Sequence, residues 1–275
     1  MGDTRLDHVA LAVWRWSDAR AALVDRLGGR FLGGLRMAAY SPCQLAFANG
    51  MRVELLEPGT DDSSFLARFI ARSGAGPHHV TFKVDDIRVA IKRARDAGLQ
   101  VVGERLGDSS WQEAFLHPSS TGIGFVIQLA QSDFNPATAM ASAPGSVTAA
   151  EAGLAPAEAE AAAPESAAIP FFTSAVPDLA DATALLTEIL HGQAGEERTD
   201  GASRFREFSW QADTARIVLT ESTDDPQAAT PPVGIHALAV TAGAAPGFPI
   251  ESHLDGWDVT PVLPELGVRL LTQIR

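Results

Sequence analysis

The 275-residue chain has a single cysteine, no excess of basic residues and no long apolar run, and each shortage excludes a class of protein. Cys43 alone cannot form an internal disulfide or a Cys-x-x-Cys zinc site. The net charge of −13 disfavours non-specific binding to nucleic acid or anionic membranes, because phosphate contacts need a basic surface. No stretch approaches the roughly 20 apolar residues of a membrane span, and the first residues lack an apolar signal segment. We therefore expect a cytoplasmic protein that binds neither nucleic acid nor membrane.

The basic residues are concentrated in the first half of the chain. Residues 1–134 hold 15 of the 34 acidic and 15 of the 21 basic residues, so the whole net charge falls on residues 135–275. Residues 135–168 are mostly Ala, Pro, Glu, Gly and Ser, a composition that buries too little apolar surface to offset its ordering entropy. We expect a first domain over residues 1–134, a linker over 135–168 and a second domain over 169–275.

A pattern of one strand, one helix and three further strands recurs along the chain. Each copy opens with an apolar strand, continues through a Ser- or Asp-capped helix and reaches a glycine 14 to 16 residues after the last valine of the strand. These opening strands are expected at residues 6–13, 77–84 and 171–176, and a shortened fourth copy begins at 234–240. The predicted fold is α+β, with paired βαβββ modules in two tandem domains, the second of which is degenerate.

Four polar side chains occupy matching strand positions in the first two modules. His8 precedes Glu54 by 46 residues in the first module. In the second, His79 precedes Gln128 by 49 residues. Taken singly, such a residue is more often a core or solvent-facing residue than a ligand, but the symmetric placement favours a shared groove. Two imidazoles and two side-chain oxygens suit a divalent first-row metal with positions left for substrate.

Two cations accompany these residues. Arg52 and Lys83 lie two and four residues from Glu54 and His79 along their strands, and therefore on the same strand faces. Either side chain can hold a substrate carboxylate or phosphate, or else remain a solvated charge at the rim of the groove. The sequence contains no phosphate loop and no Gly-x-Ser-x-Gly nucleophile motif.

These segments resemble the vicinal oxygen chelate superfamily of glyoxalases, bleomycin-resistance proteins and dioxygenases, and within it the methylmalonyl-CoA epimerases. The resemblance covers residues 5–131 and rests on residues 6–13, 51–58, 76–86, 114–118, 122 and 128–129. It implies one divalent ion, with Co, Ni, Zn, Mn and Fe all candidates, held by His8, Glu54, His79 and Gln128. It also implies that a carboxylate, here Glu54, moves a substrate proton. His79 rather than His78 matches the family, and strand alternation is expected to point His78 the other way.

Two positions depart from the epimerase pattern. Gln128 stands where epimerases carry Glu, and an amide is no useful proton acceptor. Residues 40–44 contain no carboxylate where epimerases carry a second Glu. Glu54 is then the principal candidate for proton transfer, and Glu113 is the second.

Three functions remain open. The first is a metal-dependent epimerase, isomerase or lyase that removes a proton next to the carbonyl of a small oxo acid or acyl-CoA. The second is a non-catalytic protein that binds a ligand or sequesters an antibiotic in the same groove. The third is an extradiol-type dioxygenase, which Gln128 disfavours. The expected partner is a small-molecule substrate, and pairing as a homodimer stays open.

The second half of the chain is expected to lack an ion site. Phe171 stands where His8 stands in the first module, and Val218 stands where Glu54 does. His236 is compared with His79, with a shift of one or more residues left open. One ion site per chain is therefore predicted.

Overall fold

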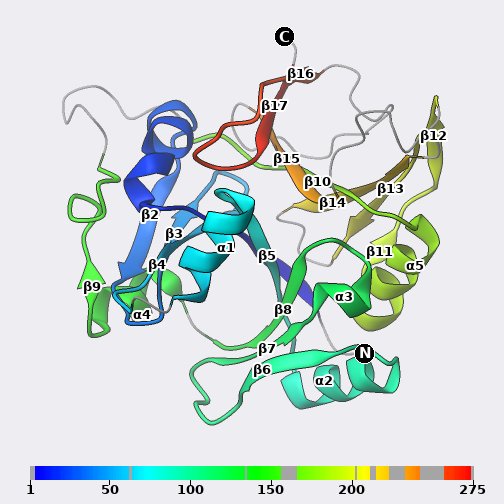
Figure 1. Ribbon diagram of the computed structural model, residues 1–275, viewed down its shortest axis with the longest axis horizontal. Coiled ribbons are helices and arrows are strands. Elements are labelled where there is room, and N and C mark those ends of the chain that lie inside the picture. The colour runs from blue at the N-terminus through cyan, green and yellow to red at the C-terminus, as the bar shows by residue number, and fades with distance from the viewer. Residues whose placement is uncertain are drawn as a thin grey trace.

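Two β-sheets form the framework of the molecule (Figure 1). The computed structural model describes residues 4–61, 64–133, 135–155, 166–201, 203–210, 215–222, 233–241 and 257–273. Nine strands make up the first sheet and eight the second. The fold is α+β, as the sequence predicts.

The first sheet contains two modules with the same order of elements. The first module consists of β1 (Arg5–Ala12), η1 (Trp16–Ala19), η2 (Arg20–Arg26), β2 (Arg30–Leu35), β3 (Tyr40–Ala46) and β4 (Arg52–Pro58). After α1 (Phe65–Ser73), the second module consists of β5 (Gly76–Lys83), α2 (Ile87–Asp96), β6 (Val101–Arg105), β7 (Gln112–Leu116), α3 (Pro118–Thr121) and β8 (Val126–Gln131). The βαβββ order predicted for both modules is thus confirmed. The serine cap expected for the first helix is wrong, because that helix begins at Trp16 with Arg15 at its N-cap.

The two modules meet edge to edge in the middle of this sheet. The strand order is β6-β7-β8-β5-β1-β4-β3-β2-β9. Strands β1 and β5 pair antiparallel, and each also pairs in parallel with the last strand of its own module, β4 or β8. The opening strands of both modules therefore lie side by side at the centre, where the predicted site residues begin.

Helix α2 shows why the sequence pattern was informative. The side chain of Asp86 accepts hydrogen bonds from the backbone amides of Arg88 and Val89, which caps the first turn. Ile87, Ala90, Ile91 and Ala94 form its buried face. The helix ends before Gly98, whose φ of +78° is readily adopted by glycine. Capping, apolar spacing and the stop thus agree with the helix predicted from the sequence.

The second sheet repeats the strand pairing of the first. Its elements are β10 (Phe171–Ala175), α5 (Leu179–Ala184), η3 (Leu185–Ile189), β11 (Gln193–Ala194), β12 (Arg198–Asp200), β13 (Ser203–Ser209), β14 (Arg216–Ser222), β15 (Gly234–Val240), β16 (Trp257–Val259) and β17 (Arg269–Gln273). Strand β10 pairs with β14 in parallel and with β15 antiparallel, and β15 pairs with β17 in parallel. These are the relationships that β1 has to β4 and β5, and that β5 has to β8.

The segment expected to be a linker packs against the first sheet over part of its length. Helix α4 (Pro136–Ser142) is followed by β9 (Ser146–Val147), which pairs with the edge strand β2. Two of the few large apolar residues of the segment, Met140 and Leu154, are buried. Residues 156–165 lie outside the described part of the chain, and the proposed domain boundaries stay a prediction.

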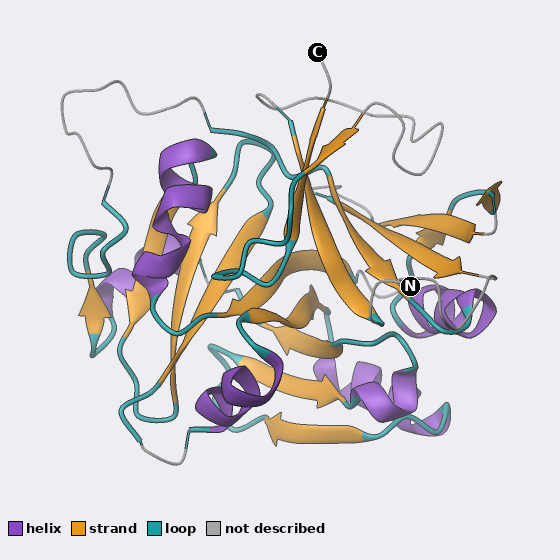
Figure 2. Cartoon of the chain, turned by 45° about the horizontal axis from the view of Figure 1, so that its top comes forward, coloured by secondary structure: helices purple, strands orange, loops and turns teal. Residues whose placement is uncertain are grey.

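One apolar core joins the two sheets. Phe82 of β5 and Trp210, which follows β13, lie with their ring centroids 5.0 Å apart and are both buried. Arg93 of α2 donates a hydrogen bond to the carbonyl oxygen of Ile189 in η3. Figure 2 shows the helices at the periphery of the two sets of strands. In the described part of the chain, no helix is long and apolar enough to cross a membrane.

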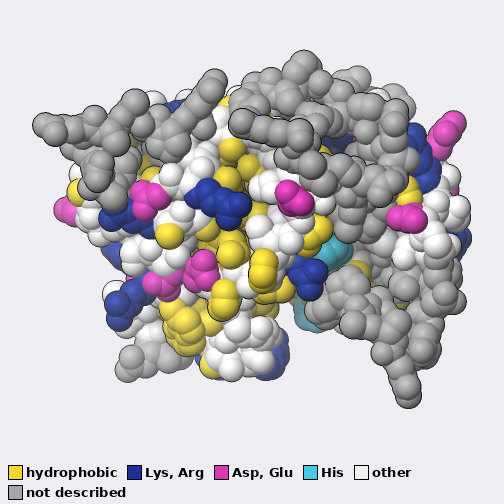
Figure 3. Space-filling view, turned by 90° about the horizontal axis from the view of Figure 1, so that it is seen from above, with side chains coloured by type: hydrophobic (Ala, Val, Ile, Leu, Met, Phe, Trp, Pro, Cys, Tyr) yellow, Lys and Arg dark blue, Asp and Glu magenta, His cyan; other side chains and the backbone are white. Residues whose placement is uncertain are grey.

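The surface carries charges of both signs. On the face drawn in Figure 3, basic and acidic side chains are interspersed among apolar ones. Elsewhere on the surface, Lys92 and Asp96 of α2 form an exposed ion pair one helical turn apart. Such exposed pairs contribute little to stability.

Candidate metal centre

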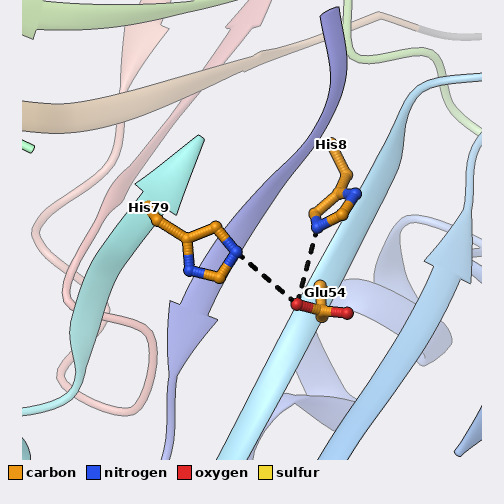
Figure 4. Close-up of side chains that lie close together, drawn as sticks. All are labelled: His8, Glu54 and His79. Carbon is orange, nitrogen blue, oxygen red and sulfur yellow. Dashed lines mark ion pairs between the residues drawn. The ribbon is translucent and has the colours of Figure 1, made fainter. Parts of the chain in front are cut away.

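Three of the four predicted ligands meet at the centre of the first sheet. Ligand atoms of His8, Glu54 and His79 lie within 4.8 Å of one another, and all three residues are buried. Oε2 of Glu54 is 3.5 Å from Nε2 of His8 and 3.7 Å from Nε2 of His79 (Figure 4). Two imidazole nitrogens and one carboxylate oxygen in this arrangement form a donor set suited to a divalent first-row metal.

The strand register explains why these side chains converge. Ala10 of β1 lies opposite Glu54 of β4 on one side and opposite His79 of β5 on the other. Cross-strand partners share a face of the sheet, and His8 lies two residues before Ala10 on that same face. Because the side chain at position 10 is a single methyl group, the three longer side chains have room to approach one another.

His79 has a buried, neutral ring with one nitrogen available to a ligand. Its Nε2 atom is buried and has no hydrogen-bond partner among the described residues. Burial, together with the neighbouring His78 and His8, holds the pKa of His79 well below 6.5, so the ring is neutral. A neutral imidazole offers a lone pair, and a buried nitrogen without a partner is unfavourable unless something binds it. The residues present therefore fit a divalent ion.

Asp7, the residue before His8, contacts the ring nitrogen of His8 that faces away from Glu54. Nδ1 of His8 lies 2.8 Å from a carboxylate oxygen of Asp7. Although burial opposes ionisation, the hydrogen bond and charge of His8, with the charge of Arg52, lower the pKa of Asp7 to about 2. The carboxylate is therefore the acceptor, Nδ1 is the donor, and Nε2 is turned toward Glu54. Such a carboxylate–histidine pair commonly orients a metal-binding imidazole.

The protonation of His8 is set by the same neighbours. Burial disfavours the imidazolium, but the charge of Glu54 and the hydrogen bond to Asp7 outweigh it and raise the pKa of His8 to about 9. Without an ion, the positive charge of His8 thus balances two nearby carboxylates. Coordination through Nε2 requires that this proton leave, so ion binding and proton release are coupled.

His78 points toward the site, and the expectation that it points away is wrong. His79 lies opposite Ala10 and Pro77 lies opposite Leu11, so His78 is an extra residue in a β-bulge. Its Nδ1 atom lies 2.9 Å from Nδ1 of His79. The bulge interrupts the alternation of side chains on which the prediction depended.

Gln128, the fourth predicted ligand, lies beside the triad with both ends of its amide hydrogen-bonded. Its Oε1 accepts a hydrogen bond of 2.5 Å from the hydroxyl of Thr81, and its Nε2 donates one of 2.7 Å to Glu113. The Thr81 hydroxyl is also 2.9 Å from Nε2 of His8. Thr81 was missed in the sequence, although its place two residues after His79 puts it on the same strand face. Coordination by Gln128 stays a prediction.

Of the two predicted substrate cations, Arg52 lies near the triad and Lys83 does not. The guanidinium of Arg52 forms an ion pair with Asp7 and donates a hydrogen bond of 3.0 Å to Gln44. Arg52 also lines the cavity beside the triad. The ammonium of Lys83 donates to the backbone oxygen of Ser132 and is not among the residues lining the cavity beside the triad.

A cavity of about 620 Å³ opens beside the triad. Its polar wall includes Glu54, His79, Gln128 and Glu113. The apolar walls come from both modules and from helix α4, and include Met37, Tyr40, Phe65, Trp111, Phe115 and Met140. This volume falls in the usual range for small-molecule sites, and apolar walls around a few converging polar groups are typical of them.

The second sheet has apolar residues at all four ligand positions. Its strand register places Phe171, Val218, Ala237 and Leu271 where His8, Glu54, His79 and Gln128 stand in the first sheet. All four belong to one buried apolar cluster. His236 is the bulged residue of β15 and thus corresponds to His78, one position away from His79.

A two-module sheet with two histidines and a glutamate at its centre defines an α+β protein with a candidate metal-dependent site. The family model "Glyoxalase/Bleomycin resistance protein/Dioxygenase superfamily" matches residues 7–115. The chain is 33% identical over 132 residues to the mitochondrial methylmalonyl-CoA epimerase of Bos taurus, covering 46% of this chain and 74% of that protein. It is 31% identical over 133 residues to the ethylmalonyl-CoA/methylmalonyl-CoA epimerase of Cereibacter sphaeroides, covering 46% and 97%. The chain belongs to the glyoxalase/bleomycin resistance/dioxygenase superfamily.

Solved structures extend the likeness in fold to both sheets. A mutant of 4-hydroxymandelate synthase from Streptomyces coelicolor matches with a TM-score of 0.62 at 16% identity, covering 88% of this chain and 71% of that one. The methylmalonyl-CoA epimerase of Mycobacterium tuberculosis matches with a TM-score of 0.43 at 27% identity, covering 47% and 89%. The first of these supports the fold of nearly the whole chain.

Proposed function

We propose that this protein is a metal-dependent enzyme that removes a proton next to the carbonyl group of a small oxo acid or an acyl-CoA. The observation that carries the proposal is the buried Nε2 of the neutral His79, which has no hydrogen-bond partner among the described residues and faces Glu54 and His8. The epimerases among the relatives favour this reaction over the other chemistries of the superfamily.

His8, Glu54 and His79 would hold the ion, and Gln128 would add its oxygen after giving up the hydrogen bond from Thr81. A divalent ion bound there supplies a Lewis acid that stabilises negative charge on a carbonyl oxygen. Glu54 lines the cavity and is the ligand that can also accept a proton, so we assign it a role in proton transfer. The apolar walls of the cavity exclude water around the reacting carbon.

The relatives are named for acyl-CoA substrates, and we propose a thioester of this type for the present chain. Arg105 is the cation best placed to meet an anionic group of the substrate. It lines the cavity, and 61% of its side chain is exposed. Arg52 also lines the cavity, where Asp7 and Gln44 hold its guanidinium, and its contact with substrate stays a prediction. A homodimer and a cytoplasmic location remain predictions from the sequence.

The proposal is tested by the metal content of the purified protein. Inductively coupled plasma mass spectrometry should find close to one divalent ion per chain, and little in the variant His8→Ala/His79→Ala. His236→Ala, which changes a histidine of the second sheet, is the matched control and should keep its ion. Equal and negligible metal in the unchanged protein and the double variant would contradict the site.

A second candidate function is ligand binding without catalysis. The hydrogen bonds at both ends of the Gln128 amide favour it, because they satisfy that side chain without an ion. Such a protein would bind methylmalonyl-CoA or another small acid equally well after treatment with a chelator. It would also leave the C2 proton of methylmalonyl-CoA unexchanged in D2O, whereas the proposed enzyme exchanges it.

A further inference from the structure

We infer that Glu113 is a second proton-transfer residue, which faces the substrate from the side opposite Glu54. This inference rests on the proposed function and deepens it, because two carboxylates allow inversion at the carbon from which the proton is removed. Glu113 belongs to β7, is 2% exposed and lines the same cavity as Glu54. Strands β4 and β7 lie on opposite sides of the central β5–β1 pair.

The two carboxylates have matching amide partners in the two modules. In the first module, Gln44 of β3 donates a hydrogen bond of 3.2 Å to Glu54 of β4. In the second, Gln128 of β8 donates one of 2.7 Å to Glu113 of β7. In the first module the carboxylate lies on the last strand, β4, and the amide on the strand beside it. In the second module the amide lies on the last strand, β8, and the carboxylate on the strand beside it. The carboxylate missing from the Gln128 position is thus supplied one strand away.

The environment of Glu113 keeps a charged group buried at the cavity wall. Trp111 Nε1 donates to its Oε2 over 2.9 Å, and Arg105 Nε lies 3.2 Å from its Oε1. Burying a carboxylate is unfavourable unless such donors surround it. Because this carboxylate lies at the wall of a cavity of small-molecule size, it is placed to exchange a proton with a bound ligand.

The chemistry balances with these two residues alone as proton carriers. The C–H bond next to the carbonyl breaks, and its proton goes to the carboxylate of Glu113. The electron pair of that bond forms the C=C bond of an enolate while the carbonyl π pair moves onto oxygen. The carboxyl group of Glu54 returns a proton to the opposite face, which re-forms the C–H bond with inverted configuration. Exchange with water then restores the proton of Glu54 and removes that of Glu113.

The variant Glu113→Gln tests the role because it keeps the size of the side chain and removes the proton acceptor. The probes are the two C2 epimers of methylmalonyl-CoA, each incubated in D2O and followed by NMR and chiral chromatography. The unchanged protein should exchange and invert both epimers. The variant should lose inversion by at least about 100-fold, since general acid–base groups contribute roughly 10²–10⁴-fold. The variant should still exchange the C2 proton of the epimer from which Glu54 removes the proton. Its metal content should be unchanged.

Glu104→Gln is the matched control, because Glu104 lies on β6, pairs with Arg95 and does not line the cavity. Its exchange and inversion should equal those of the unchanged protein.

Inversion by Glu113→Gln within threefold of the unchanged protein would overturn the inference alone. So would loss of its metal together with its inversion, since Glu113 would then act only by positioning Gln128. An unchanged protein that exchanges neither epimer overturns both the proposed function and the inference. If Glu113→Gln does not fold, Glu113→Asp, which keeps the charge on a shorter side chain, should show the same selective loss.

Discussion

Asp7 accepts a hydrogen bond from Nδ1 of His8, and this contact fixes which nitrogen of the imidazole faces Glu54. Asp7 occupies a β-bulge, because Leu6 and His8 lie opposite consecutive residues of β5. His78 occupies the corresponding bulge before His79 and contacts the corresponding Nδ1 atom. In both modules a β-bulge thus places the residue before the histidine against Nδ1 of that histidine.

Replacing Asp7 by Asn should weaken metal binding about 10- to 100-fold, the usual effect of removing a carboxylate that orients a ligating histidine. Asparagine keeps the shape but lacks the charge that favours Nδ1 as the donor. Isothermal titration of the metal-free protein with Zn²⁺ and Co²⁺ measures the change. Asp25→Asn, at a partly exposed residue paired with Arg20, should bind like the unchanged protein. Equal affinities for Asp7→Asn and Asp25→Asn would show that the contact does not orient a ligand.

Tyr40, the single tyrosine, should ionise late as the pH rises. Burial, followed by the charges of Glu113 and Glu54, raises the pKa of Tyr40 to about 12 from a usual 10. Its neutral form stabilises the fold fully below pH 10, and that contribution is lost as the pH rises from 10 through 12. Absorbance at 295 nm follows the ionisation, with circular dichroism to show that the protein is folded. Glu113→Gln should lower the midpoint, and a midpoint near 10 in the folded protein would contradict the placement.

The Cys43 thiol should be unreactive in the folded protein. It is fully buried on β3, and burial, with the charge of Glu54, raises its pKa well above the usual value. Because the thiolate is the reactive species, Ellman's reagent should detect almost no thiol in buffer and one thiol per chain in guanidinium chloride. Rapid reaction in buffer would show that this strand opens readily.

Trp210→Ala should destabilise the protein by about 3–5 kcal/mol, as is typical for truncating a buried tryptophan or phenylalanine. The indole packs against Phe82 of the other sheet and donates a hydrogen bond to the carbonyl oxygen of Leu190. Urea unfolding followed by fluorescence measures the change. Trp14→Ala, at a side chain that is 51% exposed, should change stability by no more than about 0.5 kcal/mol. A loss of similar size in both variants would argue against a core shared by the sheets.

Much of the fold could be predicted because local signals and tertiary structure agree. Asp86 and Asp178 cap the helices expected after the second and third opening strands. The period-two pattern placed His8 and Glu54 on one face, where the structure brings them together. The core shared by the two sheets could not be predicted in the same way. Its contacts, such as that of Trp210 with Phe82, join residues far apart in the sequence and follow no local pattern.

The remainder of the site depends on backbone irregularities that alternation does not predict. An extra residue in each of two strands turns Asp7 and His78 toward their neighbouring histidines. Glu113 was only a secondary candidate because its contact with Gln128 joins neighbouring strands whose register is not visible in the sequence. Strand alternation shows which face Arg52 occupies, but it does not predict the ion pair of Arg52 with Asp7. Asp7 reaches Arg52 from a β-bulge.

The apolar cluster of the second sheet makes its present state hard to reverse. A histidine introduced at Phe171 alone would bring a polar ring among Val218, Ala237 and Leu271, none of which offers a carboxylate or imidazole to share an ion. Each single substitution by a metal-binding residue would therefore lower the stability of the fold, because the new polar group would be buried without a partner. Building an ion centre there requires several simultaneous changes, because the packed apolar side chains would have to be replaced together.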